Sequence, residues 1–134
     1  MLRPGNNETR IIVVPAKAGI QFFRFNGEKA NWVSSQIDAA DPHYIAPLKF
    51  TGDAKTAMAR LVKQVQAQPR AKILRSDERY LNAEFSTPLM GYTDDVEFFC
   101  DGQAIHARSS TRLGIRDFDV NRKRVEKIRA SFNA

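Results

Sequence analysis

Two predicted strands flank Asp101-Gly102, and this pattern constrains the fold more than any other part of the chain. Within residues 93–100 and 103–112, Val96 and Phe98 and then Ile105 and Ala107 recur at a spacing of two, as in strands with one buried face. Asp-Gly between such segments favours a type I′ turn, because both central residues of that turn need positive φ. The sequence therefore predicts a β-hairpin with a two-residue turn at Asp101-Gly102.

The expected register decides which polar side chains meet on one side of this hairpin. With Cys100 opposite Gln103, the pairs on that side are Asp95 with Arg108, Glu97 with His106, and Thr93 with Ser110. We interpret them as a solvated face with cross-strand ion pairs, each contributing about 0.2–1 kcal/mol. The alternative is an acid–base site, in which a carboxylate beside His106 orients the imidazole.

The other side of the hairpin places polar groups where apolar ones are expected. It holds Val96 and Phe98, and the same register puts Asp94 opposite Ser109 on that side. In the C-terminal helix, Asn121 and Arg122 fall within or beside the apolar stripe. Buried polar groups need partners, so we expect these four to satisfy one another. They form either a structural lock or the polar end of a ligand pocket between helix and sheet, and we rank them above His106 as a candidate site.

A helix precedes the strands, and another follows them. Gly52-Asp53 starts the first, with Asp53 as N-cap, and Pro69 ends it at or before Gln68. Its apolar stripe has helical spacing: Ala54, Ala57, Met58, Leu61, Val62 and Val65. Asp117 or Asp119 caps the last helix, whose inner face is expected to hold Phe118, Val125, Ile128 and Phe132.

The remaining elements complete an α+β fold. Strands are predicted at 48–51, 71–76 and 80–87, and residues 31–47 are expected to be a loop. The order is β-α-β-β-β-β-α. An antiparallel sheet with two helices packed on one face is the simplest architecture that buries both helical stripes.

Composition limits the class of protein. A chain of 134 residues with 43% hydrophobic and 27% charged residues is expected to form one domain with one core. No apolar stretch approaches the roughly 18 residues of a membrane span, and as written the chain is expected to be cytoplasmic. The single Cys100 excludes an internal disulfide, and we expect no metal and no cofactor, because no cluster has metal-ligand spacing.

Residues 1–29 are expected to lie outside the domain, which we place at 30–134. The segment from Ile11 to Gln21 looks like a dispersed bacterial DNA repeat read through as coding sequence, although an ordinary N-terminal strand is the alternative. If the repeat interpretation holds, the true start is displaced and the cell envelope replaces the cytoplasm as the expected location.

Motifs from Asn31 to the C-terminus resemble a bacterial and plastid family, the domain of unknown function 1499 (DUF1499). The motifs are Asn31–Gln36, His43–Ile45, Pro47-Leu48, Asp94–Phe98, His106–Ser110 and Asp119–Glu126. Relatives commonly have Cys where this chain has Trp32, and many carry a lipoprotein or other export signal. The family implies no catalytic residue. The resemblance implies one constellation of binding candidates: Ser34, Ser35, Gln36, Asp94, Asp95, Arg108, Ser109, Arg112, Asn121 and Arg122.

Three functions follow from these observations. The preferred one is a non-enzymatic module that binds a small ligand or a protein partner, because no catalytic set is complete. The second is a hydrolase-like enzyme that uses Asp94 or Asp95 with His106. The third is nucleic-acid binding through the basic C-terminal helix, which we do not expect, because one helix face is apolar and no stacking aromatics interleave with the charges. The net charge of +6 is weak evidence for an anionic partner.

Overall fold

The computed structural model of the chain describes residues 32–86, 92–112 and 119–134. The extension predicted at 1–29 lies outside these ranges, as do Asp117, one of the two predicted caps of the last helix, and Phe118, predicted on the inner face of that helix. In chain order the elements are β1 (Trp32–Ser34), β2 (Leu48–Lys49), α1 (Ala54–Gln66), β3 (Ala71–Ser76), β4 (Tyr80–Ser86), β5 (Thr93–Cys100), β6 (Ala104–Thr111) and α2 (Val120–Asn133).

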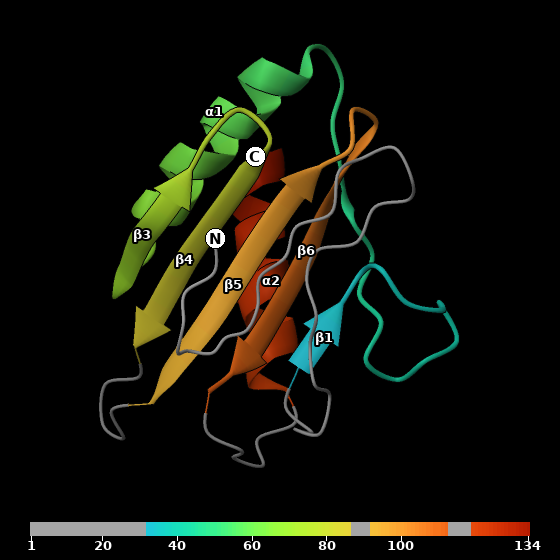
Figure 1. Cartoon of the computed structure of the whole chain (residues 1–134), viewed down its shortest axis with the longest axis vertical. Coiled ribbons are helices and arrows are strands. Elements are labelled where there is room, and N and C mark those ends of the chain that lie inside the picture. The colour runs from blue at the N-terminus through green and yellow to red at the C-terminus, as the bar shows by residue number, and fades with distance from the viewer. Residues whose placement is uncertain (1–31, 87–91, 113–118) are drawn as a thin grey trace, which may run out of the picture.

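The strands form one antiparallel sheet in the order β1-β6-β5-β4-β3, with β2 also pairing with β6. Both helices lie on one face of this sheet, α1 behind β3 and β4 and α2 behind β5 and β6 (Figure 1). The predicted α+β class and the packing of both helices on one face are confirmed. The predicted loop at 31–47 is wrong at its start, because Trp32–Ser34 pairs with β6 as a short edge strand.

Helix α1 follows from its sequence signals. The Asp53 carboxylate accepts a hydrogen bond from the Thr56 N–H, which satisfies one of the free donors of the first turn. The buried residues Ala57, Met58, Leu61 and Val65 form the predicted stripe. The helix ends before Pro69, and the chain reverses through Arg70, whose φ of +62° is in the left-handed region.

The β5–β6 hairpin forms with a register different from the predicted one. Cys100 lies opposite Ile105, and the Asp101 N–H donates to the Ala104 carbonyl, so Gly102 and Gln103 are the central residues of the turn. In the described ranges, Gly102 has positive φ and Asp101 does not. The Asp101 carboxylate instead accepts from the N–H groups of Gln103 and Ala104, which moves the turn by one residue.

This correction changes partners but not faces. Moving the turn by one residue shifts each pairing by two residues, and side chains alternate with a period of two. Val96, Phe98 and Ala107 therefore still face the helices, where they join a core that includes Leu61, Phe85 and the α2 residues Val125, Ile128 and Phe132.

Helix α2 also holds the loop between β1 and β2. Arg122 donates to the carbonyls of Pro42 and Tyr44, and Arg129, seven residues later, donates to those of Ala46 and Pro47. The His43 ring of this loop stacks on the Trp32 ring of β1 with centroids 4.0 Å apart. The loop is thus fixed to both the sheet edge and the helix. Within the described ranges, neither helix is long and apolar enough to cross a membrane.

Candidate functional site

A buried ion pair joins β5 to α2 on the helix face of the sheet. Asp94, 1% exposed, accepts a hydrogen bond from Arg124 Nη2 at 2.6 Å, and the guanidinium lies 4.4 Å from the centre of the Phe85 ring. The Arg124 Nε is buried without a hydrogen-bond partner. The sequence identified Asp94 as an unusual buried acid but predicted the wrong arginine, Arg122, as its neighbour.

Ser109 and Asn121 meet as predicted. The Ser109 hydroxyl donates to Asn121 Oδ1 at 2.6 Å, and Asn121 Nδ2 donates to Thr111 Oγ1 at 3.0 Å. All three residues are buried, and these bonds satisfy polar groups that otherwise destabilise a core. They tie the first turn of α2 to β6 and serve a structural role, while Arg122 points away to the loop at Pro42 and Tyr44.

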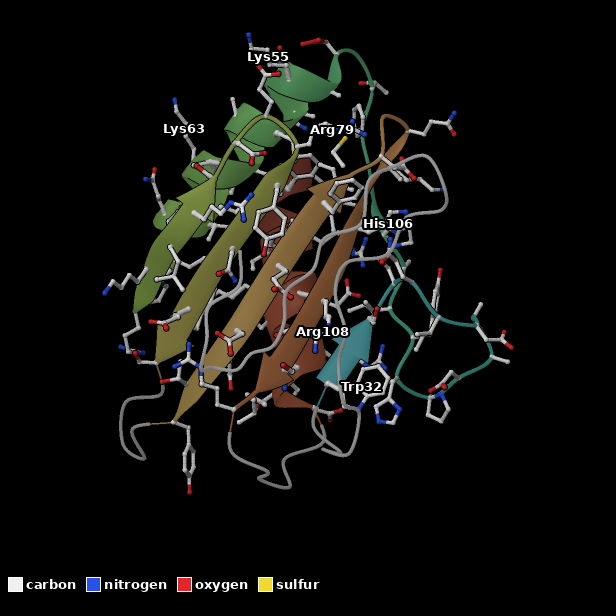
Figure 2. The ribbon with its side chains drawn as sticks, viewed as in Figure 1. Trp32, Lys55, Lys63, Arg79, His106 and Arg108 are labelled. Carbon is white, nitrogen blue, oxygen red and sulfur yellow. The ribbon has the colours of Figure 1, made fainter. Side chains whose placement is uncertain are left out.

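The opposite face of the sheet carries ion pairs, but with partners other than those predicted. Arg108 pairs with Glu97 at 3.0 Å, and the Tyr80 hydroxyl donates to the same carboxylate at 3.2 Å. Figure 2 shows Arg108 on this side of β6. Glu97 and Tyr80 are buried, so this part of the face is not the solvated surface that we expected. The shifted register accounts for the change from Asp95 to Glu97 as the partner of Arg108.

Asp95 instead binds Arg112, near the end of β6. Arg112 donates two hydrogen bonds of 2.9 Å to Asp95 and also contacts Glu84 on β4. Hydrogen bonding to Asp95 raises the pKa of Arg112; burial opposes this shift, and Glu84 adds to it. This cluster ties three strands together at the edge of the opposite face.

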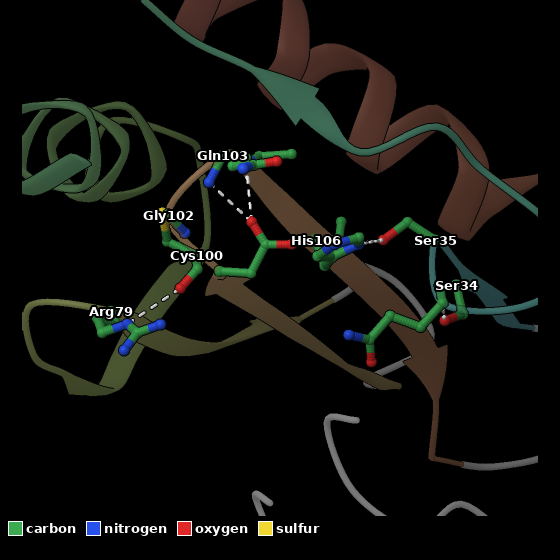
Figure 3. A network of polar contacts seen from close by, with 11 residues as sticks. Ser34, Ser35, Arg79, Cys100, Gly102, Gln103 and His106 are labelled. Carbon is green, nitrogen blue, oxygen red and sulfur yellow. Dashed lines mark hydrogen bonds and ion pairs between the residues drawn. The ribbon is translucent and has the colours of Figure 1, made fainter. Parts of the chain in front are cut away.

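His106 does not pair with Glu97, as the sequence predicted, but lies between a hydroxyl and a carboxylate. Its Nδ1 is 3.0 Å from Ser35 Oγ, as Figure 3 shows, and its Nε2 is 3.2 Å from Asp101 Oδ2. Ser35 Oγ also accepts the Ala107 N–H at 2.9 Å. A neutral imidazole protonated at Nε2 fits this arrangement: it donates to Asp101 and accepts from Ser35.

Among Ser35, His106 and Asp101, the pKa of Asp101 is shifted from its ordinary value. Burial alone would raise its pKa, but hydrogen bonds from the N–H groups of Gln103 and Ala104 and from His106 hold the pKa below its ordinary value. Ser35 is only 7% exposed, and its hydroxyl is bonded to backbone and imidazole. Ser35 therefore fixes the chain after β1 to β6, an arrangement that no pattern in the sequence indicates.

A groove of about 270 Å³ opens where the end of α1, the end of β4 and the start of α2 meet. Pro69, Phe85 and Val120 give it apolar walls. Its polar lining comes from Arg124 and from four further residues: Gln68, Arg70, Ser86 and Lys127. Periodicity could not reveal this groove, because most of these residues lie at the ends of elements. The Asp94–Arg124 pair connects it to the polar cluster that the sequence did predict.

The predicted constellation is thus divided between the two faces of the sheet. Asp94, Ser109 and Asn121 lie on the helix face. Asp95, Arg108, Arg112 and Ser34 belong to the opposite face, where Ser34 lies opposite Arg108 and its hydroxyl accepts the Gln36 N–H. Cys100 is a buried core residue. In the described part of the chain, no group of three or more His, Cys, Asp or Glu side chains could hold a metal ion.

The comparisons with known proteins match this chain to a family but not to a function. A family model described as a protein of unknown function (DUF1499) matches residues 25–132. No curated protein matches the chain, and no solved structure does.

Proposed function

The chain belongs to the DUF1499 family, whose description names no function, and we propose that it is a non-enzymatic module that binds a small ligand in the groove between α1, β4 and α2. The observation that carries this proposal is the lining of the groove. Apolar walls from Pro69 and Phe85 stand beside the guanidinium of Arg124, which donates a hydrogen bond to Asp94. Small-molecule sites combine apolar walls with a few oriented polar groups in this way.

The size of the groove limits the ligand. About 270 Å³ is close to the lower end of the range of roughly 300–1,000 Å³ typical of ligand pockets. A metabolite with one polar group and a short apolar part fits this space better than a nucleotide or an extended peptide. Phe85 belongs to the core and Arg124 is held by Asp94, so these two lining residues need little ordering when a ligand binds.

The geometry supports catalysis less well. Asp94 and His106 lie on opposite faces of the sheet, since Asp94 faces the helices and His106 faces away. Asp95 is occupied by Arg112, and the Ser35 hydroxyl by the Ala107 N–H. An acid–base pair of Asp94 or Asp95 with His106 would need these contacts to rearrange, whereas the groove needs no rearrangement.

Nucleic-acid binding is also less well supported. Arg122 and Arg129 are held by loop carbonyls, and Arg124 by Asp94. Of the basic run on α2, Lys123 and Lys127 are the exposed side chains, and a phosphate backbone is usually bound by a larger number of cations.

Native mass spectrometry of the gently purified full chain tests the proposal. We expect a small molecule bound with one-to-one stoichiometry, and we expect Ser86→Trp to abolish its retention by filling the groove. Ser76→Trp, the same change in an exposed residue at the end of β3, is the matched control and should retain the molecule. A ligand that stays bound to folded Ser86→Trp protein, or that is lost only from Ser76→Trp, contradicts this site.

A further inference from the structure

The groove has an excess of positive charge in its described lining. It holds three cations, Arg70, Arg124 and Lys127, and no carboxylate among its described residues. Arg124 is neutralised by Asp94, but in the described part of the chain neither Arg70 nor Lys127 has an ion-pair partner. We infer that the ligand carries an oxyanion, a carboxylate or a phosphate, on a short apolar chain; this inference rests on the proposed function and names the chemical class of its ligand.

The orientation of Arg124 assigns the oxyanion to one end of its guanidinium. Nη2 donates to Asp94, and Nε is buried without a partner. Nη1 makes no hydrogen bond to the described residues and, unlike Nε, is not fully buried. The Phe85 ring, 4.4 Å from the guanidinium, and the hydrogen bond to Asp94 hold the plane of the guanidinium. Such a fixed donor loses little conformational freedom when it binds an oxyanion.

Lys127 and Arg70 add charge from two sides. Lys127 follows Arg124 by three residues on α2, and residues at this spacing are neighbours on the helix surface. Arg70 comes from the segment after α1, where its own carbonyl accepts the Ser86 N–H at 3.2 Å and fixes the turn beside the groove. The oxyanion is thus expected between Arg124 and Lys127, with Arg70 at the rim and the apolar chain against Pro69 and Phe85.

Asp94 acts as a positioning residue in this arrangement. A lone guanidinium in the same place would be free to turn, whereas the hydrogen bond from Nη2 to Asp94 holds its position and leaves Nη1 for the ligand. Asp94 is buried and is not among the described lining residues of the groove, so it neutralises Arg124 without occupying the ligand position.

Amphiphiles with similar chains and different head groups test the oxyanion inference separately from the proposed function. The full chain is titrated calorimetrically with octanoate, octyl phosphate, octanol and acetate. We expect at least one of the two anionic amphiphiles to bind about tenfold or more tightly than octanol, because charge-assisted hydrogen bonds are roughly twice as strong as neutral ones. The stronger of the two identifies the oxyanion. Acetate should bind more weakly than octanoate, since it lacks the chain that contacts the apolar walls.

Variants then locate the charge effect. Lys127→Ala should weaken the anionic amphiphile about three- to tenfold and leave octanol unchanged, because one charge-assisted bond is lost. Lys123→Ala, an exposed lysine on the same helix outside the lining, is the matched control and should change neither affinity. Raising the salt concentration should weaken the anions but not octanol.

The outcomes distinguish the two claims. Equal binding of octanol and both anions, blocked by Ser86→Trp, would overturn the oxyanion inference and leave the groove as a ligand site. Anion binding that Lys123→Ala weakens as much as Lys127→Ala would show diffuse attraction to the helix and also overturn it. If no amphiphile binds but mass spectrometry shows a retained neutral ligand of another class, only the oxyanion inference is overturned. If no amphiphile binds and no ligand is retained, the oxyanion inference and the proposed function are both overturned.

Discussion

Arg124 on α2 donates a 2.6 Å hydrogen bond to Asp94 on β5, and this contact links a buried acid of the sheet to the lining of a surface groove. The carboxylate is almost fully buried, while the Arg124 side chain is 18% exposed. A buried carboxylate is destabilising unless it is paired and hydrogen-bonded. The pair therefore holds α2 on the sheet and, in our proposal, orients the group that meets the ligand.

Replacing the buried acid tests the structural part of this account. Asp94→Asn leaves the Arg124 charge without its partner, and we expect a loss of about 3 kcal/mol in the free energy of unfolding, the lower end for broken buried ion pairs because Arg124 keeps some exposure. The measurement is urea denaturation. Asp95→Asn, which removes a neighbouring carboxylate paired with the more exposed Arg112, should cost less than about 1 kcal/mol. Equal stability of the two variants would contradict a structural role for the Asp94 pair.

Ser35, which follows the edge strand β1, offers a second test. Ser35→Ala leaves the buried N–H of Ala107 without its acceptor and removes a partner of His106. We expect a loss of about 1–3 kcal/mol in unfolding free energy, the range for an unsatisfied buried polar group. Ser76→Ala on the exposed end of β3 should stay within about 0.5 kcal/mol of the parent. A Ser35→Ala protein as stable as Ser76→Ala would show that this hydroxyl does not hold β1 to β6.

The lowered pKa of Asp101 predicts a pH dependence of stability. A carboxyl whose pKa is lower in the folded than in the unfolded state stabilises the fold above the unfolded pKa, which is 3.8 for the reference aspartate. That contribution disappears as the pH falls through the folded value. We therefore expect Asp101→Asn to be less stable than the parent near neutral pH, with the difference shrinking once the pH drops below 3.8.

Denaturation of both proteins over a pH series measures this effect. Asn keeps an oxygen that can accept the N–H groups of Gln103 and Ala104, so the variant retains the turn but loses the charge and the oxygen that accepts from His106. A difference in unfolding free energy that stays constant from neutral pH to well below 3.8 would exclude a charge effect at this position.

Arg70 gives a prediction in which stability and binding move in opposite directions. Its φ of +62° is unfavourable for a side chain but not for glycine, so Arg70→Gly should raise the free energy of unfolding by about 0.5–1 kcal/mol. The same change should weaken the anionic amphiphile. Arg75→Gly, within β3, should instead destabilise by about 0.5–1 kcal/mol. Destabilisation by Arg70→Gly would mean that the arginine side chain contributes to the fold itself.

Much of the fold follows from local patterns in the sequence. The stripe from Ala57 to Val65 and the cap at Asp53 predict α1 correctly, because each depends on residues close in sequence. The two faces of the hairpin are also correct despite the shifted turn, since a shift of two residues preserves the side-chain alternation. Strand β1 was missed because its three residues carry little periodicity and are defined by pairing with distant β6.

The partners of polar side chains were harder to predict. Arg122 and Arg124 are two residues apart and equally basic, and only the rotation of α2 on the sheet decides that Arg124 reaches Asp94. Likewise, the position of the turn depends on two hydrogen bonds that the Asp101 carboxylate accepts from the N–H groups of Gln103 and Ala104. The groove depends on how three element ends meet in space, so the sequence identified its buried acid but not its lining.

Amide NMR of the full chain during a titration with octanoate tests the central claim most directly, because it locates the ligand rather than only detecting it. The account predicts saturable shifts confined to the groove: the segment from Gln68 to Arg70, the end of β4 at Ser86, and the start of α2 up to Lys127. Shifts centred on His106 and Arg108 would place the site on the opposite face. Such a result would contradict the groove as the ligand site, whereas no saturable shift with either octanoate or octyl phosphate would contradict the oxyanion inference.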